Sequence, residues 1–147
     1  MKNPSEQILA KLKQIPGSDS LEIPPKIFLE MQGQFLSYVE NASMKNSFPI
    51  FEKYEGPMGN TQGGIITAAF DNTYGPFSYL VAQGPCVTID ITTSFIRPIS
   101  MNDEELIVEV FLTAKTKSLL FMDGKAYNKT GKLVATSTTR MMIVKIP

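Results

Sequence analysis

The sequence of 147 residues contains no histidine, no tryptophan and a single cysteine, Cys86. Without histidine the chain cannot use Ser-His-Asp or Cys-His catalysis, a histidine-ligated metal or an Asp-His hydratase dyad. One cysteine excludes an internal disulfide, which is typical of a reducing cytoplasm. Without a histidine Cys86 is a weak candidate nucleophile, and we expect it to be a small apolar filler. Any catalysis must depend on carboxylates, hydroxyls, amides and backbone dipoles.

The chain also lacks an excess of charge and a long apolar run. It carries 14 basic and 14 acidic residues, so no strong field favours nucleic acid or an anionic membrane. No stretch reaches the length of a membrane span, and the first residues lack the apolar core of a signal peptide. We therefore expect a cytoplasmic protein with a single domain over residues 1–147, large enough to bury its own core.

The first part of the chain predicts a helical extension over residues 1–32. Apolar residues recur at helical spacing from Glu6 to Ile15, and Ser5 stands where an N-cap is expected. A second helical turn is expected from Lys26 to Met31, after two prolines.

A long, apolar and alanine-rich helix begins near Ile65. Within it, Gly75-Pro76 is expected to cause a kink or an early end, because proline has no N–H to donate along the helix. Asp71 is the only charged residue between Gly56 and Ile89. A carboxylate in apolar surroundings is costly unless it is paired, hydrogen-bonded or neutralised. Asp71 is therefore a candidate functional residue.

Two interpretations of Asp71 stay open. It could lie on the solvated face of an amphipathic helix, since Thr67, Asp71 and Ser78 share one stripe at helical spacing. That stripe holds one charge only, whereas an ordinary solvated face carries several. The pattern favours a buried helix with one functional polar stripe.

Alternating apolar and polar residues predict strands before and after this helix. Strict alternation from Cys86 to Ile96 predicts that Thr88 and Asp90 share one face. The expected strands run from Gln34 to Ala42, Met44 to Phe51, Cys86 to Ile96, Leu106 to Lys115, Leu119 to Asn128 and Leu133 to Ile146.

The order of these elements predicts an α+β fold. An antiparallel sheet of five to six strands would wrap around one long central helix, with a short N-terminal helix outside it. Such a sheet leaves its edges and part of the helix uncovered, so we expect the chains to pair as a homo-oligomer.

The start of the long helix is a second candidate site. The first turn of a helix has free N–H groups and the positive end of the helix dipole, and Gly63 and Gly64 let a ligand approach the backbone closely. Such an end can bind phosphate, or hold the oxyanion that forms from a carbonyl. A tight entry turn without a ligand is the alternative.

The spacing of the two candidate sites limits how they can cooperate. Asp71 lies eight residues beyond Gly63, which is about 12 Å along one helix. A base and the oxyanion donors must both come within ~3–3.5 Å of the reacting atoms. One helix cannot place both on one carbonyl, but two antiparallel helices across a dimer could.

Four short segments carry a resemblance to a known family. They are Asn60-Thr61-Gln62-Gly63-Gly64, Asp71-Asn72, Val87-Thr88-Ile89-Asp90 and Ser94-Phe95-Ile96-Arg97-Pro98. In this combination the chain resembles the hotdog-fold thioesterases, and more narrowly the phenylacetate-pathway type within the 4-hydroxybenzoyl-CoA thioesterase superfamily, over about residues 33–145. The resemblance implies hydrolysis of acyl-CoA thioesters without a metal or cofactor, by a dimer or a dimer of dimers.

The resemblance also implies roles for individual residues. Gly63 would donate an amide N–H to the thioester carbonyl, with Gly64 beside it. Asp71 of the facing subunit would act as base or nucleophile, and Thr88 would orient the water. Arg97 could meet the phosphates of CoA, although a structural ion pair is an equal alternative.

Two positions depart from the family pattern. Gln62 stands where many members have histidine, and its amide could still donate a hydrogen bond. Gly56 stands where some members have an asparagine, for which Asn60 could substitute. Asn72 and Tyr74 complete the candidate substrate-binding residues. The alternative function is a non-catalytic module that binds acyl-CoA or a fatty acyl group on the same fold.

Overall fold

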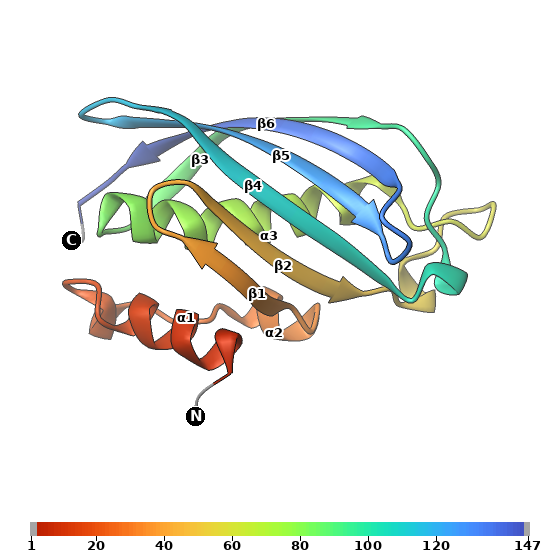
Figure 1. Ribbon diagram of the computed structural model, residues 1–147, viewed down its shortest axis with the longest axis horizontal. Coiled ribbons are helices and arrows are strands. Elements are labelled where there is room, and N and C mark those ends of the chain that lie inside the picture. The colour runs from red at the N-terminus through yellow and green to blue at the C-terminus, as the bar shows by residue number, and fades with distance from the viewer. Residues whose placement is uncertain (1–2, 146–147) are drawn as a thin grey trace.

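A six-stranded antiparallel sheet curves around one long helix, α3, in the computed structural model, which describes residues 3–145 (Figure 1). The strand order across the sheet is β1-β2-β4-β5-β6-β3. The α+β architecture predicted from the sequence is confirmed. The strands are β1 (Gln34–Val39), β2 (Ser43–Pro49), β3 (Cys86–Phe95), β4 (Glu105–Lys115), β5 (Leu119–Asn128) and β6 (Leu133–Ile143). The predicted end of the last strand, Ile146, lies outside the described residues.

Helix α3 (Gly63–Ala82) spans 20 residues and packs its aromatic side chains against the sheet. Phe70, Tyr74 and Phe77 are fully buried. Pro76 lies inside the helix, which continues to Ala82, so the predicted early end is wrong. Aromatic side chains before and after the proline are anchored in the core, and this burial outweighs the lost backbone hydrogen bond.

The N-terminal extension covers part of α3 and the β1 edge of the sheet (Figure 1). It contains α1 (Pro4–Lys13) and α2 (Lys26–Glu30). The Asn3 side chain accepts a hydrogen bond of 2.8 Å from the Glu6 N–H, so the predicted cap at Ser5 is wrong. Asn3 caps the helix because Pro4 takes the first helical position, where its missing N–H costs nothing. Short 3-10 turns occur at Ser18–Ser20, Glu52–Tyr54 and Met101–Asp103.

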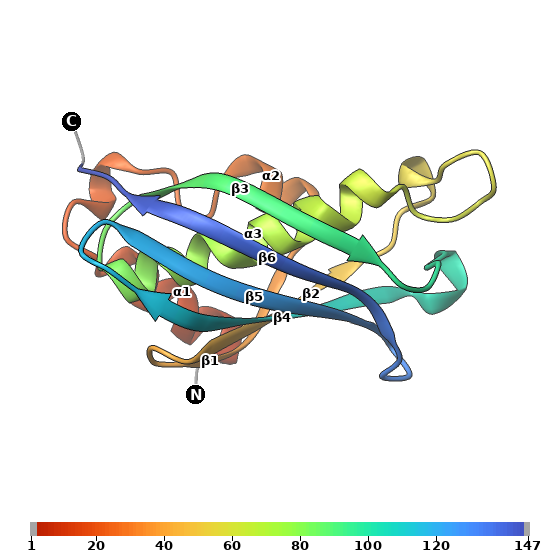
Figure 2. The same cartoon turned by 90° about the horizontal axis from the view of Figure 1, so that it is seen from above.

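Strand β3 is the edge strand beside α3, and its one neighbour among the described residues is β6 (Figure 2). Thr88 pairs with Met141 and Asp90 pairs with Arg140, so Ile89 is an extra residue in a β-bulge. Met141 is buried and Arg140 is exposed. The bulge therefore turns Thr88 toward the helix and Asp90 toward the outer face. The prediction that these two residues share one face is wrong.

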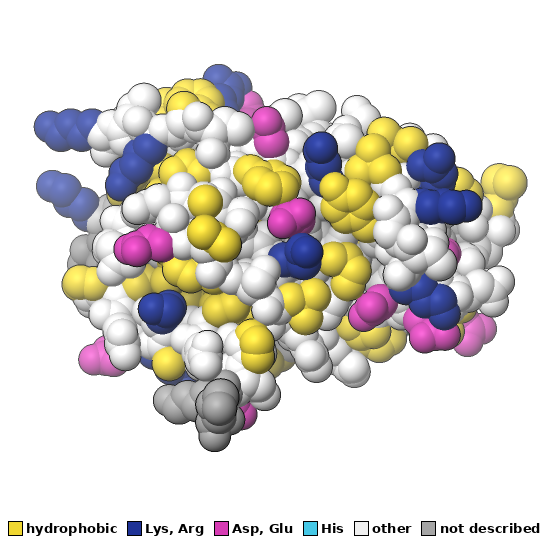
Figure 3. Space-filling model, viewed as in Figure 1, with side chains coloured by type: hydrophobic (Ala, Val, Ile, Leu, Met, Phe, Trp, Pro, Cys, Tyr) yellow, Lys and Arg dark blue, Asp and Glu magenta, His cyan; other side chains and the backbone are white. Residues whose placement is uncertain are grey.

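The surface seen in Figure 3 mixes basic and acidic side chains with apolar ones. Within residues 3–145, no helix is long and apolar enough to cross a membrane.

Candidate active site

Asp71 lies on the exposed flank of α3, next to β3. The Thr88 hydroxyl on β3 donates a hydrogen bond of 3.0 Å to Asp71 Oδ1. One turn earlier on the helix, the Thr67 hydroxyl donates to Thr93 at 3.1 Å. Asp71 is exposed in the single chain, whereas nine of the 20 residues of α3 are buried. Ser78, the third residue of the expected stripe, is fully buried.

A cavity of about 220 Å³ opens beside Asp71 and Thr88. Asn72 also lines it, and its side chain donates a hydrogen bond of 2.8 Å to the Ala68 carbonyl. The remaining walls are mainly apolar and come from the N-terminal extension, from α3 beyond Asp71 and from the sheet. These walls include Leu12, Ile23, Pro25, Gly75, Pro76, Tyr79, Cys86 and Met141.

The first turn of α3 forms a second, separate site. Gln62 is the N-cap residue, and its side chain makes no capping hydrogen bond. The first amides of the helix, from Gly63 and Gly64, therefore have no capping partner from Gln62. A Cβ atom on Gly63 would lie 2.9 Å from the Phe95 ring, so any other residue here would require this exposed ring to shift.

A shallow cavity of about 350 Å³ lies at this helix start. Asn60, Gly63 and Arg97 line it together with Phe95. The Arg97 guanidinium donates a hydrogen bond of 2.8 Å to the Leu133 carbonyl. Arg97 is exposed, so its remaining donors face the solvent at the mouth of this cavity.

The predicted site residues thus form two groups that do not meet within one chain. Asp71, Asn72 and Thr88 line one cavity, and Asn60, Gly63 and Arg97 line the other. The helix geometry separates Asp71 from Gly63 by about 12 Å.

Tyr74 joins neither group. It is fully buried, and a Cβ atom on Gly124 of β5 would lie 2.7 Å from its hydroxyl oxygen. Burial raises the pKa of Tyr74 to about 12. Tyr74 is part of the core between α3 and the sheet, so the structure gives no contact between this side chain and either cavity.

Most residues that line the cavity beside Asp71 were not among the predicted site residues, and Gly75 and Cys86 are two of them. Gly75 lies four residues after Asp71, so both face the same side of the helix. Cys86 is buried, and this burial raises the pKa of its thiol. The helical spacing from Asp71 was the available signal for Gly75. Ile23 and Leu12 gave no such signal, because they lie far from Asp71 in the sequence and reach the cavity only through the folding of the N-terminal extension onto α3.

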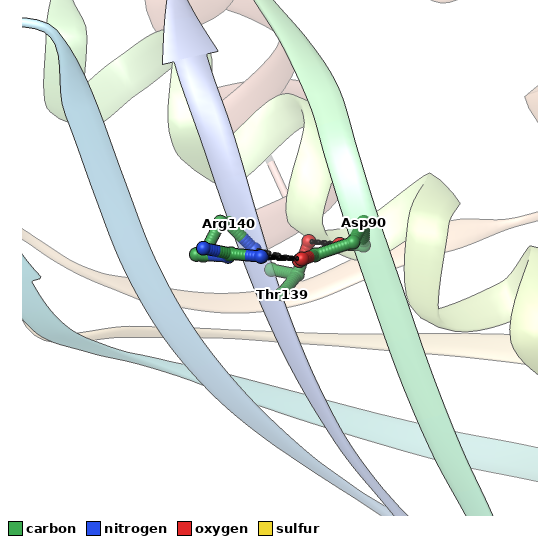
Figure 4. A network of polar contacts seen from close by, with 3 residues as sticks. All are labelled: Asp90, Thr139 and Arg140. Atoms are coloured by element: carbon green, nitrogen blue, oxygen red, sulfur yellow. Dashed lines mark hydrogen bonds and ion pairs between the residues drawn. The ribbon is translucent and has the colours of Figure 1, made fainter.

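Asp90 and Arg140 form an ion pair directly after the bulge that precedes Asp90 (Figure 4). Asp90 accepts hydrogen bonds from the Arg140 guanidinium and, at 3.1 Å, from the Arg140 N–H. The Thr139 hydroxyl donates to the Asp90 carbonyl at 2.7 Å. The Arg140 guanidinium lowers the pKa of the Asp90 carboxyl. These bonds tie β3 to β6 at the residue after the bulge.

The side chains of the described residues form no cluster of metal ligands. Among residues 3–145, no three His, Cys, Asp or Glu side chains are grouped so that they could hold an ion. The groups available at the two cavities are the Asp71 carboxylate, the Arg97 guanidinium, the Cys86 thiol, hydroxyls, amides and the dipole of α3.

Solved structures with the same fold include several thioesterase-family proteins. A phenylacetic acid degradation-related protein from Ralstonia eutropha JMP134 is 22% identical, with a TM-score of 0.77, covering 90% of this chain and 98% of that one. The PaaI protein from the E. coli phenylacetic acid degradation operon is 15% identical, with a TM-score of 0.78, covering 94% and 96%. The Streptococcus mutans protein smu.793, solved with acetyl-CoA, is 16% identical, with a TM-score of 0.70, covering 76% and 88%.

These structures show that the chain has the hotdog fold. No curated protein sequence matches the chain. The model of the thioesterase superfamily matches residues 58–135. This segment contains α3 and β3, and with them Asp71 of one cavity and Gly63 of the other. The chain belongs to the thioesterase superfamily.

Proposed function

We propose that this protein is an acyl-CoA thioesterase that works as a homodimer with two shared active sites. The observation that carries the proposal is Asp71, an exposed helix carboxylate that accepts a hydrogen bond from Thr88 beside a mainly apolar cavity. The superfamily match supports thioester hydrolysis. The acetyl-CoA bound to the Streptococcus mutans protein supports a CoA thioester as the substrate.

The edge strand β3 supports the dimer. It is 10 residues long, and an exposed edge of this length is a template for pairing with another chain. Val87, Ile89 and Phe95 expose large apolar side chains along it. Antiparallel pairing of two β3 strands around a two-fold axis would run the two α3 helices side by side. Gly63 of one protomer would then approach Asp71 of the other.

The reaction at such a site is a hydrolysis that balances without a cofactor. The thioester carbonyl oxygen would accept hydrogen bonds from the Gly63 and Gly64 amides, which stabilise the oxyanion as it forms. If Asp71 acts as base, it takes a proton from water, the water oxygen bonds to the carbonyl carbon, and the C–S bond breaks. The proton on Asp71 then passes to the CoA thiolate, leaving acid and thiol.

Asp71 can also act as nucleophile. Its oxygen then bonds to the carbonyl carbon and expels CoA thiolate, leaving an anhydride that water hydrolyses. A rapid-quench experiment with mass spectrometry separates the two routes. A protein adduct of one acyl group on the Asp71 peptide in the first turnover identifies the nucleophile, and its absence throughout that turnover identifies the base.

The other candidate residues receive supporting roles in this proposal. Thr88 holds Asp71 and orients the water. Gln62 donates an amide hydrogen bond at the helix start, while Asn60 and Asn72 contact the substrate on either side of the carbonyl. Arg97 places its free donors on the CoA phosphates at the mouth of the cavity.

Thiol release from acetyl-, octanoyl-, palmitoyl- and benzoyl-CoA tests the activity. Wild type should hydrolyse at least one of them, and Asp71→Asn should lose at least ~10³-fold in kcat while it still binds the substrate. Full turnover in Asp71→Asn would refute the mechanism. Saturable binding without turnover by wild type would instead establish the non-catalytic acyl-CoA binder.

Mixed dimers test whether the site is shared. An Asp71→Asn chain and a Gly63→Val chain should each be inactive alone. After co-expression, activity should return to about a quarter of wild type, because about half of the dimers are mixed and each of these has one intact site. A site built within one chain would show no such recovery.

A further inference from the structure

Gly75 lies in the middle of α3, where glycine is unfavourable. In a helix interior it costs about 1 kcal/mol relative to alanine. It stands four residues after Asp71, so it faces the same side of the helix one turn further on. Gly75 lines the cavity beside Asp71, and a Cβ atom built on it would meet no atom within 4 Å. The space above Gly75 is therefore part of the open cavity.

The opposite wall comes from the N-terminal extension. Ile23 and Pro25 line the same cavity as Gly75, although they lie about fifty residues earlier in the sequence. Leu12 of α1 lines the same cavity and is almost completely buried. Tyr79, one further turn along α3, lies beyond Gly75. The cavity thus leads from the carboxylate of Asp71 along an apolar path between α3 and the extension.

Resting on the proposed function, we propose that Gly75 is the residue that determines acyl size, and that this cavity holds a medium-length acyl chain against the N-terminal extension. A volume of about 220 Å³ is roughly seven times the ~30 Å³ that one water molecule takes up in the liquid, and a methylene group is of similar size. An octanoyl group has seven carbons beyond its carbonyl. A side chain at position 75 would occupy part of this space one helical turn beyond Asp71, where a longer acyl chain would lie and an acetyl group would not reach.

Gly75 also has a local reason to be glycine, because it precedes Pro76. A residue with a Cβ atom before proline is disfavoured in helical conformation. Gly75→Ala and Gly75→Leu share this penalty, since both add the Cβ. They differ in how much of the cavity they fill, so comparing them separates backbone strain from pocket filling.

The test is the ratio of kcat/KM for octanoyl-CoA to that for acetyl-CoA. In Gly75→Leu this ratio should fall about tenfold or more. In Gly75→Ala it should fall by less, because the smaller alanine side chain displaces fewer methylenes of the octanoyl chain from the cavity. Ile23→Ala shortens a side chain of the opposite wall and so enlarges the cavity, which should move the preference toward lauroyl-CoA. Gly84→Ala is the matched control, because Gly84 lies outside this cavity and its Cβ would also meet no atom within 4 Å; it should keep the wild-type ratio.

Binding gives a readout that does not depend on turnover. S-octyl-CoA and S-ethyl-CoA are thioethers, so they cannot be hydrolysed, and calorimetry should show the same loss of preference in Gly75→Leu. An unchanged ratio of affinities and of kcat/KM in folded Gly75→Leu would overturn the inference, as would equal losses in the alanine and leucine variants. Absence of turnover in wild type, with the binding preference still lost in Gly75→Leu, would refute the proposed hydrolysis and retain the acyl pocket.

Discussion

The hydroxyl of Thr88 donates a hydrogen bond to the carboxylate of Asp71, 17 residues earlier in the chain. Two features bring these side chains together. The exposed flank of α3 presents Asp71 beside the edge strand, and the bulge at Ile89 turns Thr88 toward the helix. The bond occupies one carboxylate oxygen and leaves the other open for a water or a substrate. A carboxylate oriented in this way is suited to act on a bound thioester.

Removal of the Thr88 hydroxyl should slow the reaction without unfolding the protein. Thr88→Val keeps the shape and loses the donor, so we expect kcat to fall about tenfold to a hundredfold, as for loss of a hydrogen bond to a charged group. Thr88→Ser keeps the donor and should retain most of the activity. Steady-state kinetics with the best acyl-CoA measure both. Equal activity in the valine and serine variants would show that the hydroxyl has no role in the reaction.

Replacement of Gly124 on β5 by alanine should strongly destabilise the fold. A Cβ atom there would lie 2.7 Å from the Tyr74 hydroxyl oxygen and 2.8 Å from the Phe70 ring, and both aromatic side chains are fully buried. Because neither can move into solvent, Gly124→Ala should lower the free energy of unfolding by about 1–3 kcal/mol. Urea unfolding gives this value directly. Gly84→Ala, with no atom within 4 Å of the added Cβ, should unfold like wild type.

The sequence predicted the long helix and the two candidate groups on it because their signals are local. Asp71 stands alone in an apolar segment, and Gly63-Gly64 precedes a helical pattern. The bulge at Ile89 was not predictable in this way. An extra residue in a strand looks like ordinary alternation until the register with Arg140 is known.

Tyr74 illustrates the other limit of the sequence. It was a candidate for the substrate pocket as an aromatic residue of the long helix, three residues after Asp71. The structure buries it against the sheet. Helical periodicity places residues around an axis, but the direction of the sheet is set by contacts with strands that come later in the chain.

Because of Cys86, the free energy of unfolding should decrease as the pH rises into the alkaline range. Burial raises the pKa of its thiol above the ordinary value of 9.0, so the folded state keeps a proton that the unfolded state releases. Stability from this group is present below pH ~9 and is lost as the pH rises above the unfolded pKa. The free-energy difference between wild type and Cys86→Ala should therefore shrink from pH 7.5 to pH 10 in urea titrations. A difference independent of pH would show that the thiol titrates alike in both states.

The edge strand gives a prediction about assembly and activity together. Ile89 is 46% exposed at the bulge of β3, and a charge there would be buried without a partner if two β3 strands pair. Ile89→Lys should shift the protein from dimer to monomer in sedimentation experiments and lower kcat/KM in parallel, although Asp71 and Gly63 are both present. Met142→Lys is the control, because Met142 is similarly exposed on β6, inside the sheet. A fully active monomer of the Ile89→Lys variant would mean that one chain carries the whole site, since no second protomer would be available to bring Gly63 to Asp71.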